Sequence, residues 1–158
     1  MTTAAAACTV REATRADLLD VFRIERQCFP QPWPFAAFER FLGQPGFLVA
    51  ERDAPAPDEN PLAGYVVADT VPNHGQPLGH IKDLAVHPAY RGQGIGKELL
   101  SQALFVLATA NASSVKLEVR ASNEPAISLY RSFDFQPRRR IPRYYDDGED
   151  AIIMVRSF

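Results

Sequence analysis

Residues 79–108 read GHIKDLAVHPAYRGQGIGKELLSQALFVLA, and they predict a strand, a glycine-rich turn and a helix in direct succession. The apolar run 81–86 predicts the strand, which should end at His87-Pro88 because proline cannot donate to a strand ladder. Apolar residues then recur at helical spacing from Ile95 to Leu107, so an amphipathic helix is expected to begin inside the glycine run. Such a turn directs backbone N–H groups and the positive end of the helix dipole at an anion.

The glycine run does not match the two best-known phosphate loops. A Walker A loop needs Ser or Thr after its Gly-Lys pair, where this chain has Glu98. A dinucleotide-binding loop that starts at Gly92 needs a glycine where this chain has Lys97. The pattern Arg91-x-x-Gly94-x-Gly96 instead resembles the pyrophosphate loop of the GNAT acetyltransferase superfamily. A strand–helix turn without a ligand could carry the same residues, so the loop alone does not decide between them.

Composition and length place the chain among ordinary globular proteins. With 158 residues, 46% apolar and 23% charged, residues 1–158 suit a single domain with a substantial core. The net charge of −2 gives no reason to expect nucleic acid or a membrane as partner, and no apolar run could span a bilayer. Residues 1–7 are expected to be disordered and lack the features of a signal peptide. Cys8 and Cys28 form no disulfide framework, so we expect a cytoplasmic protein, and the three scattered histidines predict no metal site.

Hydrophobic periodicity and breaker residues give the order of elements. Strands are expected at 8–13, 47–52, 62–71, 78–86, 115–120, 135–141 and 151–156, and helices at 14–28, 35–42, 95–111 and 124–133. This order predicts an α/β (α+β) fold in which a mixed, mostly antiparallel sheet of about seven strands is flanked by about four helices. Two β–α–β segments imply parallel pairs near the centre of the sheet. A ligand is expected beyond the carboxyl end of the strand that precedes the glycine run.

The second half of the chain carries a more specific resemblance. The segments KLEVRASNEPAISLY (116–130), Arg143-Tyr144-Tyr145 and EDAIIM (149–154) resemble the RimI-type N-terminal acetyltransferases of the GNAT superfamily. The likeness covers roughly residues 79–154, with weaker agreement at 29–33. One departure is Asp134, where the family usually has a glycine at the end of a helix. The left-handed conformation is common there, and aspartate tolerates it better than most residues.

The resemblance implies the GNAT fold, acetyl-CoA as co-substrate, no metal, and a set of site residues. By that match Leu84, Ala85 and Val86 bind the pantetheine arm, Arg91, Gly92, Gln93, Gly94, Ile95, Gly96 and Lys97 bind the pyrophosphate, and Asn123 also contacts the cofactor. Glu118 matches the general base and Tyr130 the general acid.

The residues alone leave other roles open. Glu118 lies in an alternating charged strand face that could simply be solvated, and Tyr130 has the spacing of a core aromatic. Trp33, Tyr144 and Tyr145 are candidates to line a peptide groove, or they only pack a proline turn and a hairpin. The acidic turn 146–150 is either solvated or attracts a protonated amine.

Substrate choice follows in part from the cost of deprotonating an amine. At pH 7 an α-amine costs roughly 1 kcal/mol and a lysine between about 4 and 5 kcal/mol. This favours a protein or peptide N-terminus, with a ribosomal protein among the candidates. Acetylation of a protein lysine or a small amine is the alternative within the same fold, and a non-catalytic acetyl-CoA-binding module is the alternative outside enzymes. Sequence does not give the oligomeric state.

Overall fold

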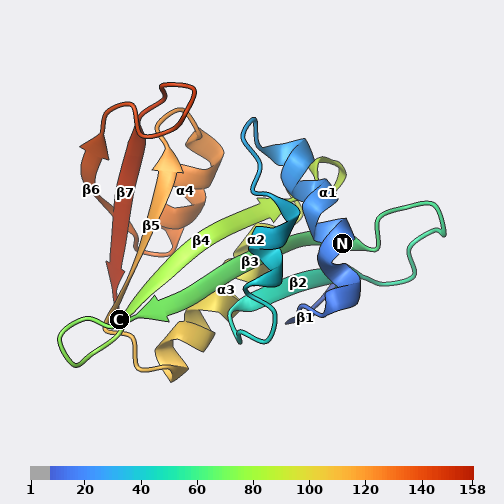
Figure 1. The fold of residues 1–158 in the computed structure, drawn as a ribbon, viewed down its shortest axis with the longest axis horizontal. Helices are drawn as coiled ribbons and strands as arrows, with labels where there is room; N and C mark the ends of the chain where they lie inside the picture. Colours follow the sequence, from blue (N-terminus) through green and yellow to red (C-terminus); the bar gives the residue numbers. More distant parts are fainter. Residues whose placement is uncertain (1–7) are drawn as a thin grey trace. The chain divides into compact units, whose positions relative to one another are not determined.

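The computed structural model describes residues 8–158. Their strands form one mixed sheet, and the helices lie in the connections between strands along the chain (Figure 1). The expectation of disorder for residues 1–7 lies outside the described residues. The strands are β1 (Cys8–Glu12), β2 (Phe47–Arg52), β3 (Leu62–Val71), β4 (Leu78–Val86), β5 (Ser114–Arg120), β6 (Gln136–Ile141) and β7 (Ala151–Ser157). The α-helices are α1 (Leu18–Cys28), α2 (Phe35–Glu39), α3 (Ile95–Thr109) and α4 (Glu124–Ser132), with 3-10 turns η2 (Arg15–Asp17) and η3 (Pro88–Tyr90). Seven strands and four helices in the described residues confirm the predicted fold class.

Most element boundaries agree with the sequence prediction to within a few residues, and β2, β3 and β4 have the predicted bounds. Two helices differ. The first α-helix begins at Leu18 because Thr14 and Asp17 form a capping box that closes a 3-10 turn before it. Helix α2 ends at Glu39, three residues earlier than predicted.

Strand pairing corrects one expectation. The first β–α–β segment forms the predicted parallel pair, in which Leu78–Ile81 of β4 lie opposite Ser114–Leu117 of β5. The second segment does not, because β7 lies between β5 and β6 and is antiparallel to both. Strand β7 pairs with the edge of β5, and β6 pairs with the other side of β7. The sheet order is therefore β1-β2-β3-β4-β5-β7-β6.

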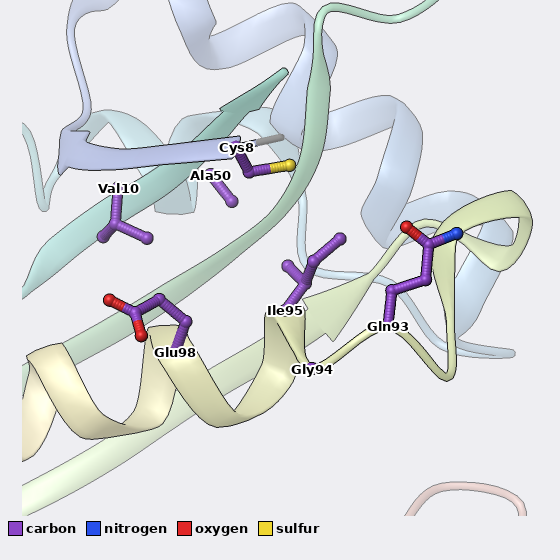
Figure 2. Close-up of a pocket in the computed structure, with 7 residues that line it drawn as sticks. All are labelled: Cys8, Val10, Ala50, Gln93, Gly94, Ile95 and Glu98. Carbon is purple, nitrogen blue, oxygen red and sulfur yellow. The ribbon is translucent and has the colours of Figure 1, made fainter. Parts of the chain in front are cut away.

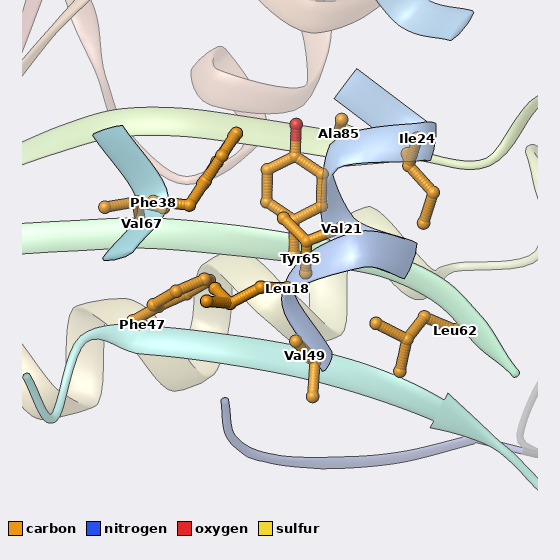
Figure 3. Close-up of a cluster of buried hydrophobic side chains, with 10 residues drawn as sticks. All are labelled: Leu18, Val21, Ile24, Phe38, Phe47, Val49, Leu62, Tyr65, Val67 and Ala85. Carbon is orange, nitrogen blue, oxygen red and sulfur yellow. The ribbon is translucent and has the colours of Figure 1, made fainter. Parts of the chain in front are cut away.

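The chain divides into two compact units, residues 8–68 with 83–106 (the first unit) and residues 69–82 with 107–158 (the second unit). Strands β3 and β4 each run from one unit into the other. The core of the first unit consists of apolar side chains from α1, α2, β2, β3 and β4 around Tyr65 (Figure 3). In the second unit the buried side chains include Val115, Leu117 and Val119 of β5 with Phe135 and Met154.

Within residues 8–158, no helix has both the length and the apolar composition that a membrane crossing requires.

Candidate active site

The glycine run lies in the first unit, directly after strand β4. At the end of β4, His87 accepts the N–H of Ala89 on Nδ1 at 3.0 Å, and Tyr90 donates its N–H to the His87 carbonyl at 2.9 Å. These bonds form the 3-10 turn η3, whose Pro88 stops the strand. The chain leaves this turn at Arg91 and enters the glycine run.

Two glycines of the run have backbone conformations that suit no other residue well. Gly92 has φ +78° and Gly94 has φ +84°, and an added Cβ at either would meet nothing within 4 Å. Conformation, not crowding, therefore requires glycine. Glu98 makes the first helical bond, from its N–H to the Gly94 carbonyl at 3.1 Å. The N–H groups of the three residues before Glu98 have no acceptor inside the helix, and Gly94 is exposed, so this end can receive an anion.

Arg91 is predicted to belong to the phosphate-binding loop, but its guanidinium contacts protein atoms. Its Nε donates to the Val86 carbonyl at 3.1 Å, and its NH2 lies 3.1 Å from the Cys28 sulfur. Cys28 also lies 3.5 Å from the Val86 carbonyl. Arg91 thus ties the start of the glycine run to the end of β4 and to helix α1.

A pocket of about 440 Å³ lies beside the start of α3 (Figure 2). Its lining residues are Cys8, Val10, Ala50, Gln93, Gly94, Ile95 and Glu98. Of these, Gln93, Gly94 and Ile95 were predicted site residues. The carboxylate of Glu98 disfavours a phosphate group inside this pocket, whereas the exposed backbone of the run carries no such charge.

Glu118 lies in the second unit, in the middle of β5. The strand alternates buried apolar residues with half-buried polar ones, so Glu118 faces away from Val119 and the core. Its side chain is only 17% exposed. Oε1 lies 2.8 Å from Nε2 of His80 on β4, and Oε2 lies 3.6 Å from Nζ of Lys116.

The two neighbours decide the charge of Glu118. Burial alone raises the pKa of a carboxyl group, but here the hydrogen bond from His80, the charge of His80 and the charge of Lys116 outweigh it. The pKa of Glu118 is therefore lower than usual, and the side chain is a carboxylate at neutral pH. The solvated charged face that the sequence left open is not what the structure shows.

Helix α4 carries the predicted acid and the predicted cofactor asparagine. Asn123 caps the helix, because its Oδ1 accepts the N–H of Ala126 at 3.3 Å. At the other end Asp134 has φ +67°, as its place in the sequence predicted. Phe135 N–H bonds the Tyr130 carbonyl at 3.1 Å and the two rings meet edge to face at 5.8 Å, which completes a Schellman motif. Tyr130 is 7% exposed, and this helix end fixes its position.

The connection between β6 and β7 brings the predicted peptide-lining tyrosines near Glu118. The rings of Tyr144 and Tyr145 meet nearly at right angles, with centroids 5.0 Å apart. Burial and then the charge of Glu118 raise the pKa of Tyr144. Burial also raises the pKa of Tyr145 to about 12, against the opposing charge of Arg120, with Tyr144 and Glu118 contributing. Both phenols therefore lie within electrostatic range of Glu118.

Three of the four acids in the turn 146–150 are paired with arginines. Arg120 on β5 bonds Asp147 at 2.8 Å and Glu149 at 3.0 Å, and its guanidinium lies 4.1 Å from the centre of the Tyr145 ring. Arg140 bonds Asp150 at 2.6 Å. These arginines hold the connection that carries the two tyrosines, so the turn has a structural role.

Comparison with known proteins gives the family. A family model described as "Acetyltransferase (GNAT) family" matches residues 18–135. The chain belongs to the GNAT acetyltransferase family. It is 36% identical to an N-alpha-acetyltransferase of Sulfolobus acidocaldarius, in a match that covers 92% of this chain and 90% of that protein. The chain is thus a RimI-like N-acetyltransferase, as the sequence motifs predicted.

Two solved structures resemble this acetyltransferase over nearly its whole length. The ribosomal-protein-S18-alanine N-acetyltransferase of Escherichia coli is 29% identical, with a TM-score of 0.77 over 95% of this chain and 93% of that one. NAA60 of Arabidopsis thaliana, solved in complex with acetyl-CoA, is 25% identical, with a TM-score of 0.81 over 96% of this chain and 99% of the other.

Other predicted residues have plain structural partners. Trp33 packs its ring against Phe38 and Phe41, with centroids 5.2 Å and 5.8 Å apart, and this packing by itself explains a tryptophan there. Of the predicted cofactor strand, Ala85 is buried and Leu84 is half-buried. Among residues 8–158 no three His, Cys, Asp or Glu side chains gather in a way that could hold a metal ion.

Sequence reasoning missed His80. The three histidines were expected to be ordinary strand and loop residues, yet His80 lies directly against the predicted base. A signal existed, because His80 and Glu118 each occupy a polar position in an alternating strand. Using it required the register of β4 on β5, which places His80 opposite Lys116.

Proposed function

We propose that this acetyltransferase moves the acetyl group of acetyl-CoA to the α-amine of a protein N-terminus, with Glu118 as general base and Tyr130 as general acid. The observation that carries the proposal is the setting of Glu118: an ionised, largely buried carboxylate held by His80 and Lys116, with two loop tyrosines in range. The N-alpha-acetyltransferase of Sulfolobus acidocaldarius and the ribosomal-protein-S18-alanine N-acetyltransferase of Escherichia coli supply the class of substrate, and the second makes a ribosomal protein a candidate.

The lowered pKa of Glu118 fits an α-amine better than a lysine. A carboxylate with a pKa below its usual value is always available as an acceptor near neutral pH, but it is a weak base. It takes the amine proton as the new bond to carbon forms, directly or through one water. An α-amine costs only roughly 1 kcal/mol to deprotonate at pH 7 and needs little help, whereas a lysine costs between about 4 and 5 kcal/mol.

For acetyl-CoA, the exposed backbone of the glycine run has the required geometry. Two positive-φ glycines and the unpaired N–H groups at the start of α3 present donors to a pyrophosphate. When bound, acetyl-CoA supplies the acetyl group as a thioester. The Val86 carbonyl is already engaged by Arg91 and Cys28, so contacts to the pantetheine arm fall to the backbone of Leu84 and Ala85. Arg91 supports the loop through these contacts, and Asn123 contributes its side-chain NH2.

Tyr130 would donate a proton, or a hydrogen bond, to the sulfur of the departing thiolate. A phenol has a pKa of about 10 and a thiol about 8.5, so complete transfer is somewhat uphill. A hydrogen bond to the developing charge still lowers the barrier. The Schellman motif at the end of α4 supports this role, because it fixes the backbone of Tyr130.

For contact with the peptide we propose side chains that the sequence singled out. Tyr144 is 46% exposed and is the better candidate for direct contact with the peptide. Tyr145 stacks on Arg120 and supports Tyr144 through the contact between their rings. From the first unit we include the segment 29–34 with Trp33. We place the enzyme in the cytoplasm, where protein N-termini are made.

The test uses three peptides with acetyl-CoA and mass spectrometry of the products. The first has a free α-amine, a small first residue and one lysine; the second has arginine in place of that lysine; the third has its α-amine blocked. We expect labelling of the first two at the α-amine and none of the third. Labelling of lysine in the blocked peptide would show a lysine acetyltransferase, and labelling of none would leave the acceptor to another class of amine.

A further inference from the structure

A buried group of acids in the first unit takes no part in the proposed transfer. Glu25 on α1 is 2% exposed, and its carboxylate accepts three hydrogen bonds. Oε1 accepts the hydroxyl of Tyr65, Oε2 accepts the backbone N–H of Trp33 at 2.8 Å, and Asp83 also bonds this carboxylate. Tyr65 is fully buried in β3, and Figure 3 shows its hydroxyl directed toward β4.

Asp83 makes the group unusual, because it puts a second carboxyl beside the first. Its Oδ2 lies 3.3 Å from the Tyr65 hydroxyl. Burial, followed by the hydrogen bond and the charge of Glu25, raises the pKa of Asp83 well above its usual value. Two buried carboxylates this close do not both ionise, so they share one proton. Because its pKa is the raised one, Asp83 is the member that holds the proton, and it donates it in a hydrogen bond to Glu25.

Other titratable groups face the pair from α1 and from the glycine run. Cys28 lies on α1, and burial raises the pKa of its thiol, with the charges of Glu25 and Asp83 adding to the rise. Arg91 opposes that rise through its hydrogen bond to the Cys28 sulfur. The guanidinium of Arg91 bonds Cys28 and Val86. The negative charge of Glu25 is instead balanced by the hydrogen bonds that it accepts from Tyr65, Asp83 and the backbone of Trp33.

The positions of the bonded groups in the chain suggest what the cluster does. The N–H of Trp33 belongs to the proline-rich segment 29–34 that follows α1. Asp83 immediately precedes Leu84, the first residue of the predicted cofactor strand. One oxygen of Glu25 is therefore bonded to segment 29–34. Through Tyr65 and Asp83 the carboxylate is also bonded to β3 and β4.

We propose that Glu25 is a positioning residue that fixes segment 29–34 against strand β4 next to Leu84. Segment 29–34, proposed to face the peptide, then keeps one geometry relative to Leu84 and Ala85, proposed to contact acetyl-CoA. The relevance of Glu25 to catalysis rests on the proposed function, but its structural part does not. A satisfied buried network of this kind holds its members in a single arrangement, and leaving one polar member unpaired is costly.

Trp33 allows a direct test, because it is the sole tryptophan of the chain. Glu25→Met removes the acceptor of the Trp33 backbone N–H, whereas Glu25→Gln keeps an oxygen on the side chain at that position. Acrylamide quenching of Trp33 fluorescence should rise at least about twofold in Glu25→Met and stay near wild type in Glu25→Gln. Glu39→Met on α2 makes the same change at a carboxylate that bonds the exposed Arg15, and it should not alter quenching.

Kinetics give the second readout. The KM for peptide should rise about five- to tenfold in Glu25→Met while the KM for acetyl-CoA changes less than about twofold, and Glu25→Gln should restore most of the loss. If Glu25→Met does not fold, Tyr65→Phe removes a single donor to Glu25 and should shift both measurements in the same direction, by less. Unchanged quenching and unchanged peptide KM in these variants would overturn the proposal. If no peptide is acetylated even by wild type, the proposed function fails, while the quenching result still decides whether Glu25 holds the segment.

Discussion

Nε2 of His80 and Oε1 of Glu118 lie 2.8 Å apart on neighbouring parallel strands. This bond, together with Lys116, keeps Glu118 ionised despite its burial. A base with a partner that can donate a hydrogen bond is held in one orientation and one charge state before the amine arrives. His80 is thus part of the proposed site, even though it carries no motif.

Replacing the proposed base should show a loss that depends on pH. Glu118→Gln keeps the shape and removes the proton acceptor, so we expect kcat to fall by roughly 10²-fold or more at pH 7. The loss should shrink at high pH, where the α-amine is already neutral. The lowered pKa of Glu118 further predicts that wild type shows no loss of activity from protonation of this group until the pH falls below about 4.5. Glu12→Gln, at the exposed end of β1, is the matched control, and normal turnover by Glu118→Gln would exclude it as the base.

Removing His80 should leave the base in place but no longer held in one orientation. His80→Phe takes away the hydrogen bond, which to a charged group is worth about 1.5–3 kcal/mol, so kcat/KM should fall by roughly 10- to 100-fold. The pKa of Glu118 should rise, because burial is then less opposed, and the acid limb of the pH profile should move upward. His80→Gln can still donate and should recover part of the loss, while His74→Gln in the exposed turn after β3 should have no effect. A wild-type profile for His80→Phe would reduce the contact to packing.

Glycine at position 94 is predicted to be required for the cofactor, not for the fold. Gly94→Val forces a β-branched residue into φ +84° and moves the backbone donors, so acetyl-CoA affinity measured by calorimetry should drop at least about tenfold. Gly43→Val is the matched control, since Gly43 has φ +85° and equally open surroundings but lies in the turn after α2. Both variants should keep the circular dichroism of wild type, and only the first should lose affinity. Equal affinities would remove the glycine run from the acetyl-CoA site.

The shared proton between Glu25 and Asp83 predicts how stability depends on pH. The native state holds a proton on Asp83 that the unfolded chain releases above about pH 4, so this group makes the protein less stable as pH rises toward its raised pKa. Asp83→Asn keeps a hydrogen-bond donor and removes the titration. The difference in free energy of unfolding, variant minus wild type, should therefore grow with pH by up to about 1.4 kcal/mol per unit. Urea unfolding from pH 5 to 9 measures it, and a difference that stays constant would mean that Asp83 is ionised in the native state.

Aspartate at the end of α4 is predicted to cost stability. Asp134 adopts φ +67° at the position where a Schellman motif favours glycine. Asp134→Gly should stabilise the protein by about 0.5–1 kcal/mol, and Asp134→Ala should fall below wild type because alanine resists this conformation without gaining a local hydrogen bond. Thermal unfolding of the three proteins gives the order directly. Alanine matching glycine would show that the helix end relaxes around the substitution.

The features that local sequence determines are those in which the interacting groups are neighbours in the chain. The strand, glycine run and helix of residues 79–108, the Asn123 cap and the left-handed Asp134 all follow from steric limits and hydrogen bonds within a few residues. Hydrophobic periodicity likewise determined the order of elements, because each helix or strand must bury one face. The family motifs added roles for Glu118 and Tyr130, and these roles stay predictions.

Tertiary structure decided whatever depends on the register between distant segments. Periodicity shows that His80 and Glu118 are polar positions of two strands, but only the pairing of β4 with β5 brings their side chains into contact. The insertion of β7 beside β5 depends on which of two strands pairs with a free edge, and local sequence does not set that choice. Glu25 and Asp83 could not be linked in advance, since a buried carboxyl pair exists only once α1 and β4 have packed around Tyr65. Hydrogen bonds and proton sharing require contact within a few ångströms, and only packing brings distant parts of a chain that close.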